Sequence, residues 1–223
     1  MFYSSSVELI RLENLDSKIK DVVSALKAGN LIIFPTETLY GIGANALNEE
    51  AVRKIFTVKK RPESKPILIL ISEIEMLNKL VLEIPKIARD LIYKFWPGPL
   101  TIIFSAKGGS AFGGKNKTGL LNALNPYGNT VAIRMTSSKT AQKIITLCGF
   151  PITATSANLN GKEAIKNYKE AMEQFGNSSL IRYMIEDENM KDSKPSTIID
   201  VSDGNLKIVR EGVIEEREIR FLS

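Results

Sequence analysis

Cations are concentrated in the segment KKRPESKP, residues 59–66, at the expected end of a helix and directly before a long apolar run. They are Lys59, Lys60, Arg61 and Lys65. Basic residues at a helix C-terminus commonly serve only to complement the helix dipole. Here two prolines fix the turn and remove two backbone donors, which favours a rigid presentation of cations to a polyanion. The segment is therefore a candidate phosphate site.

Arg134 is the one charged residue in the apolar strand-like segment TVAIRM, residues 130–135. An arginine held inside a sheet normally has an anionic partner. That partner is either a structural Asp or Glu, or the carboxylate of a substrate, which a guanidinium can bind in bidentate fashion. The sequence leaves both possibilities open.

Hydroxyl, amide and glycine residues follow two further strand-like runs. In residues 35–45, PTETLYGIGAN, two threonines and two glycines allow close approach to a ligand, although for this motif in isolation a tight bend in a sheet is the favoured explanation. In residues 153–164, TATSANLNGKEA, Ser156 and Asn158 are either turn formers or part of a nucleotide pocket at strand ends. Ser196 and Arg210, late in the chain, are weaker candidates of the same kind.

A phosphate-loop pattern occurs at residues 109–116, GSAFGGKN, and Asp200 could be taken for a second magnesium motif. Three features argue against this interpretation. Asn116 replaces the magnesium-binding hydroxyl, four residues separate the preceding strand from the first glycine, and Pro126 leaves little room for a following helix. A phosphate-loop NTPase is therefore the least favoured alternative.

These residues must be positioned by alternating strands and helices, which the apolar periodicity predicts. Asn48 is the expected N-cap of a helix that ends near Lys59 before Pro62. The Gly- and Lys-rich stretch that begins at Lys107 predicts a mobile loop, 107–128, that closes over a nucleotide. Strands are expected at 7–12, 31–44, 67–72, 101–106, 130–135, 151–156, 196–202 and 206–211, and helices at 16–28, 48–59, 72–81, 85–95, 138–148 and 167–175.

The composition narrows the class of protein. A chain of 223 residues with 43% hydrophobic and 25% charged residues is expected to form one globular domain, and no apolar run is long enough to cross a bilayer. Cys148 is the only cysteine, which favours a reducing compartment, and we expect a cytoplasmic protein. With no histidine, His-based triads and Cys/His zinc sites are excluded. The net charge of +5 suits anionic partners such as ATP or RNA.

Seven segments, taken in order, resemble the YrdC-like family of threonylcarbamoyl-adenylate synthases in its single-domain, TsaC-like form. The resemblance spans residues 19–212, and it is carried by PTETLYGIGANAL, KKRPESKP, FWPGPLT, TVAIRM, TSANLNGKEA, STIID and IVREG. It implies an α/β fold (α+β in some schemes), with a twisted mixed sheet flanked by helices around a basic concave cleft. Residues 1–223 would form one such domain, with 213–223 as a short tail.

The resemblance also implies a site. The residues that match an L-threonine subsite are Thr38, Arg134 and Ser196. Those that match an ATP subsite are Arg61, Lys65, Thr130, Ser156, Asn158 and Arg210. No residue is identified as catalytic with certainty, and Lys59, Arg61 and Lys65 are expected to position the phosphates. One departure concerns Leu70, since many family members carry a histidine near threonine at this place.

The implied reaction joins L-threonine, bicarbonate and ATP into threonylcarbamoyl-AMP and pyrophosphate, for the synthesis of N6-threonylcarbamoyladenosine in tRNA. Mg²⁺ is expected to arrive with ATP, and tRNA or a downstream threonylcarbamoyl transferase are possible partners; no membrane is involved. The alternative from a different class is a double-stranded RNA or tRNA-binding module. The basic turn lacks the interleaved aromatic residues typical of such a module.

Overall fold

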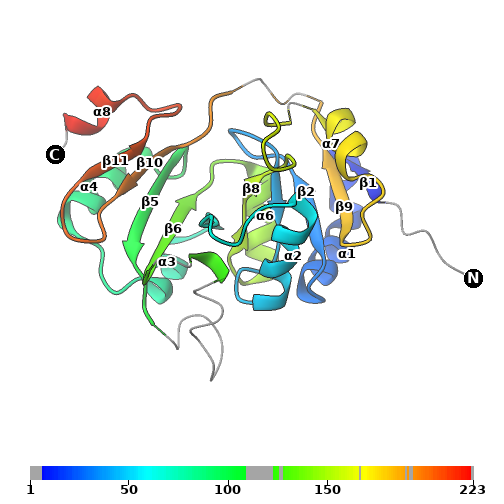
Figure 1. Cartoon of the computed structure of the whole chain (residues 1–223), viewed down its shortest axis with the longest axis horizontal. Coiled ribbons are helices and arrows are strands. Elements are labelled where there is room, and N and C mark those ends of the chain that lie inside the picture. The colour runs from blue at the N-terminus through cyan, green and yellow to red at the C-terminus, as the bar shows by residue number, and fades with distance from the viewer. Residues whose placement is uncertain are drawn as a thin grey trace, which may run out of the picture.

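Two β-sheets and the helices that flank them make up the fold (Figure 1). The computed structural model describes residues 7–108, 123–125, 128–165, 167–188, 190 and 193–221. Among these residues, no helix combines the length and apolar character that crossing a bilayer requires. Of the predicted loop 107–128, the structure describes residues 107, 108, 123–125 and 128, and the phosphate-loop pattern at 109–116 lies wholly outside the described residues.

The five-stranded sheet, on the right of Figure 1, has the order β1-β9-β2-β3-β8. Strands β1, β9 and β2 are parallel, and β3 is antiparallel to both of its neighbours, β2 and β8. Its central strand β2 is completely buried, as expected for the apolar run LIIF. The strands span Glu8–Arg11 (β1), Leu31–Phe34 (β2), Gly41–Gly43 (β3), Thr155–Ser156 (β8) and Ile181–Glu186 (β9).

The six-stranded sheet, on the left of Figure 1, has the order β11-β10-β5-β6-β4-β7. Parallel pairs, β10 with β5 and β6 with β4, alternate with antiparallel pairs. The apolar strand β4 lies inside this sheet, which confirms that its sequence is too apolar for an edge. The strands span Ile69–Ile71 (β4), Leu100–Ser105 (β5), Thr130–Met135 (β6), Ile152–Thr153 (β7), Thr197–Asp200 (β10) and Lys207–Arg210 (β11).

The helices pack amphipathic faces onto the sheets, and their ends follow local sequence signals. The side chains of Asn48 and Ser138 accept hydrogen bonds from the first turns of α2 and α6, and Gly149 ends α6 in the left-handed conformation. A short 3-10 helix, η1 (Leu12–Asn14), precedes α1. The helices are α1 (Leu15–Lys27), α2 (Glu49–Lys59), α3 (Ile74–Leu80), α4 (Lys86–Phe95), α6 (Lys139–Cys148), α7 (Tyr168–Phe175) and α8 (Glu216–Arg220).

The predicted fold class is confirmed, with its strands divided between two mixed sheets. Two predicted strands are wrong in detail. Residues 31–44 form β2 and β3 rather than one strand, because the Thr36 hydroxyl bonds the backbone of Thr38 and Leu39 and reverses the chain. Residues 151–156 form β7 and β8, which join different sheets. Strand β9 was not predicted.

Candidate functional site

A cavity lies where the two sheets meet. The turn between β2 and β3 and the segment 154–156 contribute to one side, and Arg134 of β6 with residues from β10 and β11 contribute to the other. The turn after α2 closes it further. Six of the residues predicted for the site line this cavity: Thr38, Arg61, Arg134, Ser156, Ser196 and Arg210. The structure therefore brings together side chains that lie up to 172 positions apart in the sequence, counted from Thr38 to Arg210.

Strand register explains why these side chains meet. Paired residues of neighbouring strands place their side chains on the same face of a sheet. In the six-stranded sheet Ile198 of β10 pairs with Arg210 of β11 on one side and with Thr101 of β5 on the other. Leu70 of β4 pairs with Arg134 of β6. The register of β5 with β6 joins these two sets of pairs. Arg134 and Arg210 therefore place their side chains on the same face of the sheet, where both line the cavity.

Arg134 is 2% exposed, and its Nη1 donates to the Thr38 hydroxyl at 2.9 Å. Glu37 lies near it, with Oε1 3.6 Å from Nε, a distance too long for a hydrogen bond. Burial lowers the pKa of Arg134, Glu37 opposes this shift and the charge of Arg210 adds to it. The guanidinium therefore has a carboxylate neighbour, Glu37, and also lines the cavity. A structural carboxylate and a substrate carboxylate, the two partners that the sequence left open for Arg134, are thus not mutually exclusive.

Ser196 and Arg210 form a second group beside Arg134. Arg210 donates from Nη2 to the Ser196 carbonyl at 2.7 Å and to its hydroxyl at 3.3 Å. The same hydroxyl lies 2.8 Å from that of Thr101, which is completely buried. Burial lowers the pKa of Arg210. These contacts orient a hydroxyl and a guanidinium at the end of the cavity where Arg134 lies.

Arg61 occupies the other end. Its Nη1 donates to the Thr155 hydroxyl and its Nη2 to the Pro66 carbonyl, both at 2.8 Å, and its buried Nε has no hydrogen-bond partner among the described residues. Burial lowers the pKa of Arg61. The guanidinium is therefore half-buried and fixed by β8 and by the proline-containing turn.

Lys59 does not line the cavity, but it binds the loop that contributes Ser156 to the cavity wall. Its ammonium group donates to the carbonyl oxygens of Ser156 and Asn158, the latter at 2.6 Å, and to the Asn158 amide oxygen at 3.4 Å. The Ser156 hydroxyl donates to that amide oxygen at 2.6 Å. Burial, with the charges of Arg61 and Lys65, lowers the pKa of Lys59 to about 7. Lys59 and Asn158 therefore shape the loop that presents Ser156.

Lys65 and Thr130 also lie outside the cavity wall. Lys65 is exposed, and its ammonium group donates to the Asn160 amide oxygen at 3.2 Å. Thr130 opens strand β6 four residues before Arg134, and its hydroxyl accepts from Asn125 at 2.7 Å. Because a strand advances about 3.3 Å per residue, Thr130 lies roughly 13 Å along β6 from Arg134.

Residues that the sequence did not single out complete the wall. Thr36, Tyr40, Thr155 and Ile198 line the cavity, and Glu37 stands behind Arg134. The Tyr40 hydroxyl contacts the backbone of Asp187, which ties the end of β9 to the site. Leu70, at the place where a histidine was noted as usual, is completely buried beside Arg134. These four wall residues and Glu37 all belong to segments that the sequence analysis named, 35–45, 153–164 and 196–200, but nothing in those segments singled them out individually as site residues.

The donor set of the cavity suits anions better than a resident metal ion. Its charged members are three arginines, and the described residues contain no group of three or more His, Cys, Asp or Glu side chains placed to hold a metal. Guanidinium groups bind carboxylates and phosphates in fixed, often bidentate geometry. A ligand with two separate anionic groups would match the separate positions of Arg134 and Arg61.

Known proteins resemble this chain in sequence and in fold. A family profile named Sua5/yciO/yrdC, with the description telomere recombination, matches residues 24–212. A threonylcarbamoyl-AMP synthase of Pyrococcus abyssi is 37% identical over 202 residues, which cover 91% of this chain and 56% of the relative. One of Aliivibrio fischeri is 31% identical over 190 residues, which cover 84% of this chain and 96% of the relative.

A solved structure has a similar fold. The crystal structure of P. abyssi Sua5 complexed with L-threonine matches with a TM-score of 0.85 and 33% identity, over 97% of this chain and 60% of that one. The chain thus spans a little over half of the length of the Pyrococcus protein.

Proposed function

Because the chain belongs to the Sua5/yciO/yrdC family, we propose that it is an L-threonylcarbamoyladenylate synthase. It would combine L-threonine, bicarbonate and ATP into threonylcarbamoyl-AMP and pyrophosphate, in the cytoplasm, for the synthesis of N6-threonylcarbamoyladenosine in tRNA. The relatives that carry this name support the proposal, as does the threonine complex of a similar structure. The observation that carries it is the convergence of Arg134, Arg210 and Arg61 on one cavity.

The amino acid would bind at the end where Arg134 and Arg210 lie. The carboxylate of threonine would accept hydrogen bonds from Arg134, with the hydroxyls of Thr38 and Ser196 beside it. The buried charge of Arg134 is repelled by the charge of Arg210 in the free protein, and an anionic ligand would relieve that repulsion. This end of the cavity is therefore suited to a small carboxylate.

The nucleotide would bind at the end where Arg61 lies. Each terminal nitrogen of Arg61 has a second N–H beyond the one that binds Thr155 or Pro66, and these would donate to phosphate oxygens. Lys65 would approach the same phosphates from the exposed side of the turn. Mg²⁺ would arrive as part of the MgATP substrate, since the described residues supply no carboxylate cluster for it. Bound in this way, the ion would neutralise phosphate charge.

The chain's own contribution to the reaction would be positioning and charge stabilisation. The amine of threonine would add to CO₂ with loss of a proton, or to bicarbonate with loss of water. An oxygen of the resulting N-carboxylate would attack the α-phosphorus of ATP as the bond to pyrophosphate breaks. No protein nucleophile is required, which suits a chain without histidine. Fixed cations on rigid strands stabilise the charge that develops on the phosphoryl oxygens.

Isothermal titration with ATP and L-threonine distinguishes this function from the RNA-binding alternative. We expect each ligand to bind and ATP to change the affinity for threonine, because both anions occupy one cavity. A protein that binds tRNA tightly but neither small ligand would instead be an RNA-binding module.

A further inference from the structure

The hydrogen bonds of Arg134 leave the Nε side of its guanidinium group without a hydrogen-bond partner. A guanidinium has five N–H donors. One terminal nitrogen donates to the Thr38 hydroxyl, and the Nε–H makes no hydrogen bond. Its nearest carboxylate oxygen, Glu37 Oε1, is also buried without a hydrogen-bond partner, 3.6 Å away. The two unpartnered atoms face each other, so charge attraction rather than a hydrogen bond relates them.

Glu37 is itself fixed from the opposite side. Its Oε2 accepts from the hydroxyl of Thr136 at 2.5 Å, and Thr136 is completely buried. The Thr136 hydroxyl also accepts from the backbone N–H of Ser138 at 3.2 Å. The carboxylate therefore has a defined place even though its contact with Arg134 is loose.

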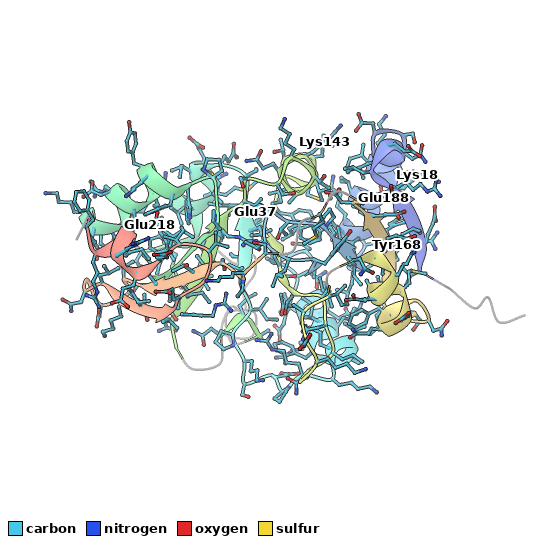
Figure 2. The ribbon with its side chains drawn as sticks, turned by 90° about the horizontal axis from the view of Figure 1, so that it is seen from above. Lys18, Glu37, Lys143, Tyr168, Glu188 and Glu218 are labelled. Carbon is cyan, nitrogen blue, oxygen red and sulfur yellow. The ribbon has the colours of Figure 1, made fainter. Side chains whose placement is uncertain are left out.

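These contacts belong to a ladder that joins the two sheets. Every second residue from Arg134 of β6 to Ser138, the N-cap of α6, binds one residue of the turn between β2 and β3. Arg134 donates to Thr38 and Thr136 donates to Glu37. The Ser138 hydroxyl donates to the Pro35 carbonyl at 3.2 Å. Figure 2 labels Glu37 near the middle of the long axis, between the two halves of the molecule. Glu37 is the one acidic member of this ladder.

We propose that Glu37 is a positioning residue, which holds the Nε side of Arg134 and thereby directs its remaining terminal N–H groups into the cavity to receive a substrate carboxylate. Glu37 is not among the cavity-lining residues, so it acts through Arg134 rather than on the ligand. The proposal rests on the proposed function for the identity of the ligand. The orientation of Arg134 can be tested without that ligand.

The first test measures L-threonine and ATP affinities by titration for the wild type, Glu37→Gln, Arg134→Lys and the double variant. Glutamine keeps an acceptor for Thr136 but removes the charge, so we expect threonine affinity to fall about tenfold while ATP affinity stays within about twofold. If Glu37 acts through Arg134, the double variant should lose no more threonine affinity than Arg134→Lys alone. Additive losses, or tighter threonine binding by Glu37→Gln, would overturn the proposal.

Two further variants separate positioning from general stability. Glu216→Gln removes one negative charge and one arginine ion pair, that with Arg220 on α8, a helix that contributes no residue to the cavity wall, and should leave both affinities unchanged. Thr136→Val releases Glu37 but keeps both charges, and should weaken threonine binding in the same direction. If Glu37→Gln does not fold, Thr136→Val decides, because unchanged threonine affinity in that variant contradicts the proposal.

The ligand-independent test is the side-chain ¹H–¹⁵N resonance of Arg134 Nε, assigned by its loss in Arg134→Lys. Burial should make it visible in the wild type, and Glu37→Gln should shift or broaden it. If the wild type fails to bind threonine but this shift occurs, the proposed function fails and the positioning role stands. A resonance that is unchanged in Glu37→Gln rejects the positioning role.

Discussion

In the proposed site, ATP binding would depend chiefly on Arg61. Its side chain is already fixed by Thr155 and Pro66, so its remaining terminal N–H groups are held in place before a ligand arrives. A preorganised donor loses little conformational entropy on binding. Lys65 is an exposed, flexible cation and lacks this advantage. The two residues of the basic turn should therefore contribute unequally to ATP binding.

Arg61→Ala should weaken ATP binding by about ten- to a hundredfold, because a charge-assisted hydrogen bond is worth about 1.5 to 3 kcal/mol. Lys65→Ala should have a smaller effect. Titration with ATP measures both, and Lys94→Ala, an exposed cation on α4, is the matched control. Normal ATP affinity in Arg61→Ala would remove this residue from the site.

Lys59 should make the unfolding free energy of the protein depend on pH. Its pKa in the folded protein is about 7, lowered from 10.5, so the charged form is disfavoured by folding. The folded protein releases this proton near pH 7, whereas the unfolded chain keeps it up to about pH 10.5. The unfolding free energy should therefore rise with pH across this window, by up to about 1.4 kcal/mol per pH unit.

Denaturant unfolding of the wild type and of Lys59→Met at pH 7, 8 and 9 measures that dependence. The methionine variant lacks the titrating amine, so the wild type should gain stability relative to it as the pH rises. A constant difference between the two proteins would mean that the carbonyl oxygens around Lys59 keep its amine protonated throughout.

At the scale of the elements, the segment after β11 is bound closely to the start of β10. The Thr197 hydroxyl accepts from the backbone N–H groups of Gly212 and Ile214, at 2.9 and 3.0 Å, and donates to the Ile214 carbonyl at 2.6 Å. A Cβ on Gly212 would lie 2.1 Å from the Pro195 carbonyl oxygen. Only glycine fits here, directly beside Ser196 and Arg210.

Gly212→Ala should consequently lower the unfolding free energy by about 1 to 3 kcal/mol and weaken threonine binding, since Ser196 must move. Thermal melting and threonine titration test this. Gly108→Ala is the control, because nothing lies within 4 Å of its added Cβ. Equal melting temperatures and equal threonine affinities in the two variants would show that the segment after β11 is not tightly packed.

The elements also show where sequence reasoning succeeds. Helices α2 and α6 were predicted closely because each carries its own apolar face and an N-capping side chain, Asn48 or Ser138. The division of 31–44 into two strands depends on one hydroxyl, Thr36, and that of 151–156 on which sheet each half joins. Such choices are made by tertiary pairing and leave no local periodicity to detect.

At the scale of the whole molecule, the cavity exists only because the two sheets meet. The basic turn and Arg134 were identified from residue type and setting, but their approach to Ser196 and Arg210 follows from strand order and register. The resemblance to a family supplied that arrangement in advance. Lys65 and Thr130, carried over in the same way, lie outside the cavity wall, and their roles remain predictions.

The central claim is that one cavity binds threonine and ATP and joins them. Its most direct test is to incubate the purified protein with MgATP, L-threonine and bicarbonate and to measure pyrophosphate release. Release should require all three substrates and should be accompanied by threonylcarbamoyl-AMP, identified by mass spectrometry. Pyrophosphate release that is equally fast without threonine, or no release with all three substrates present, would contradict the claim.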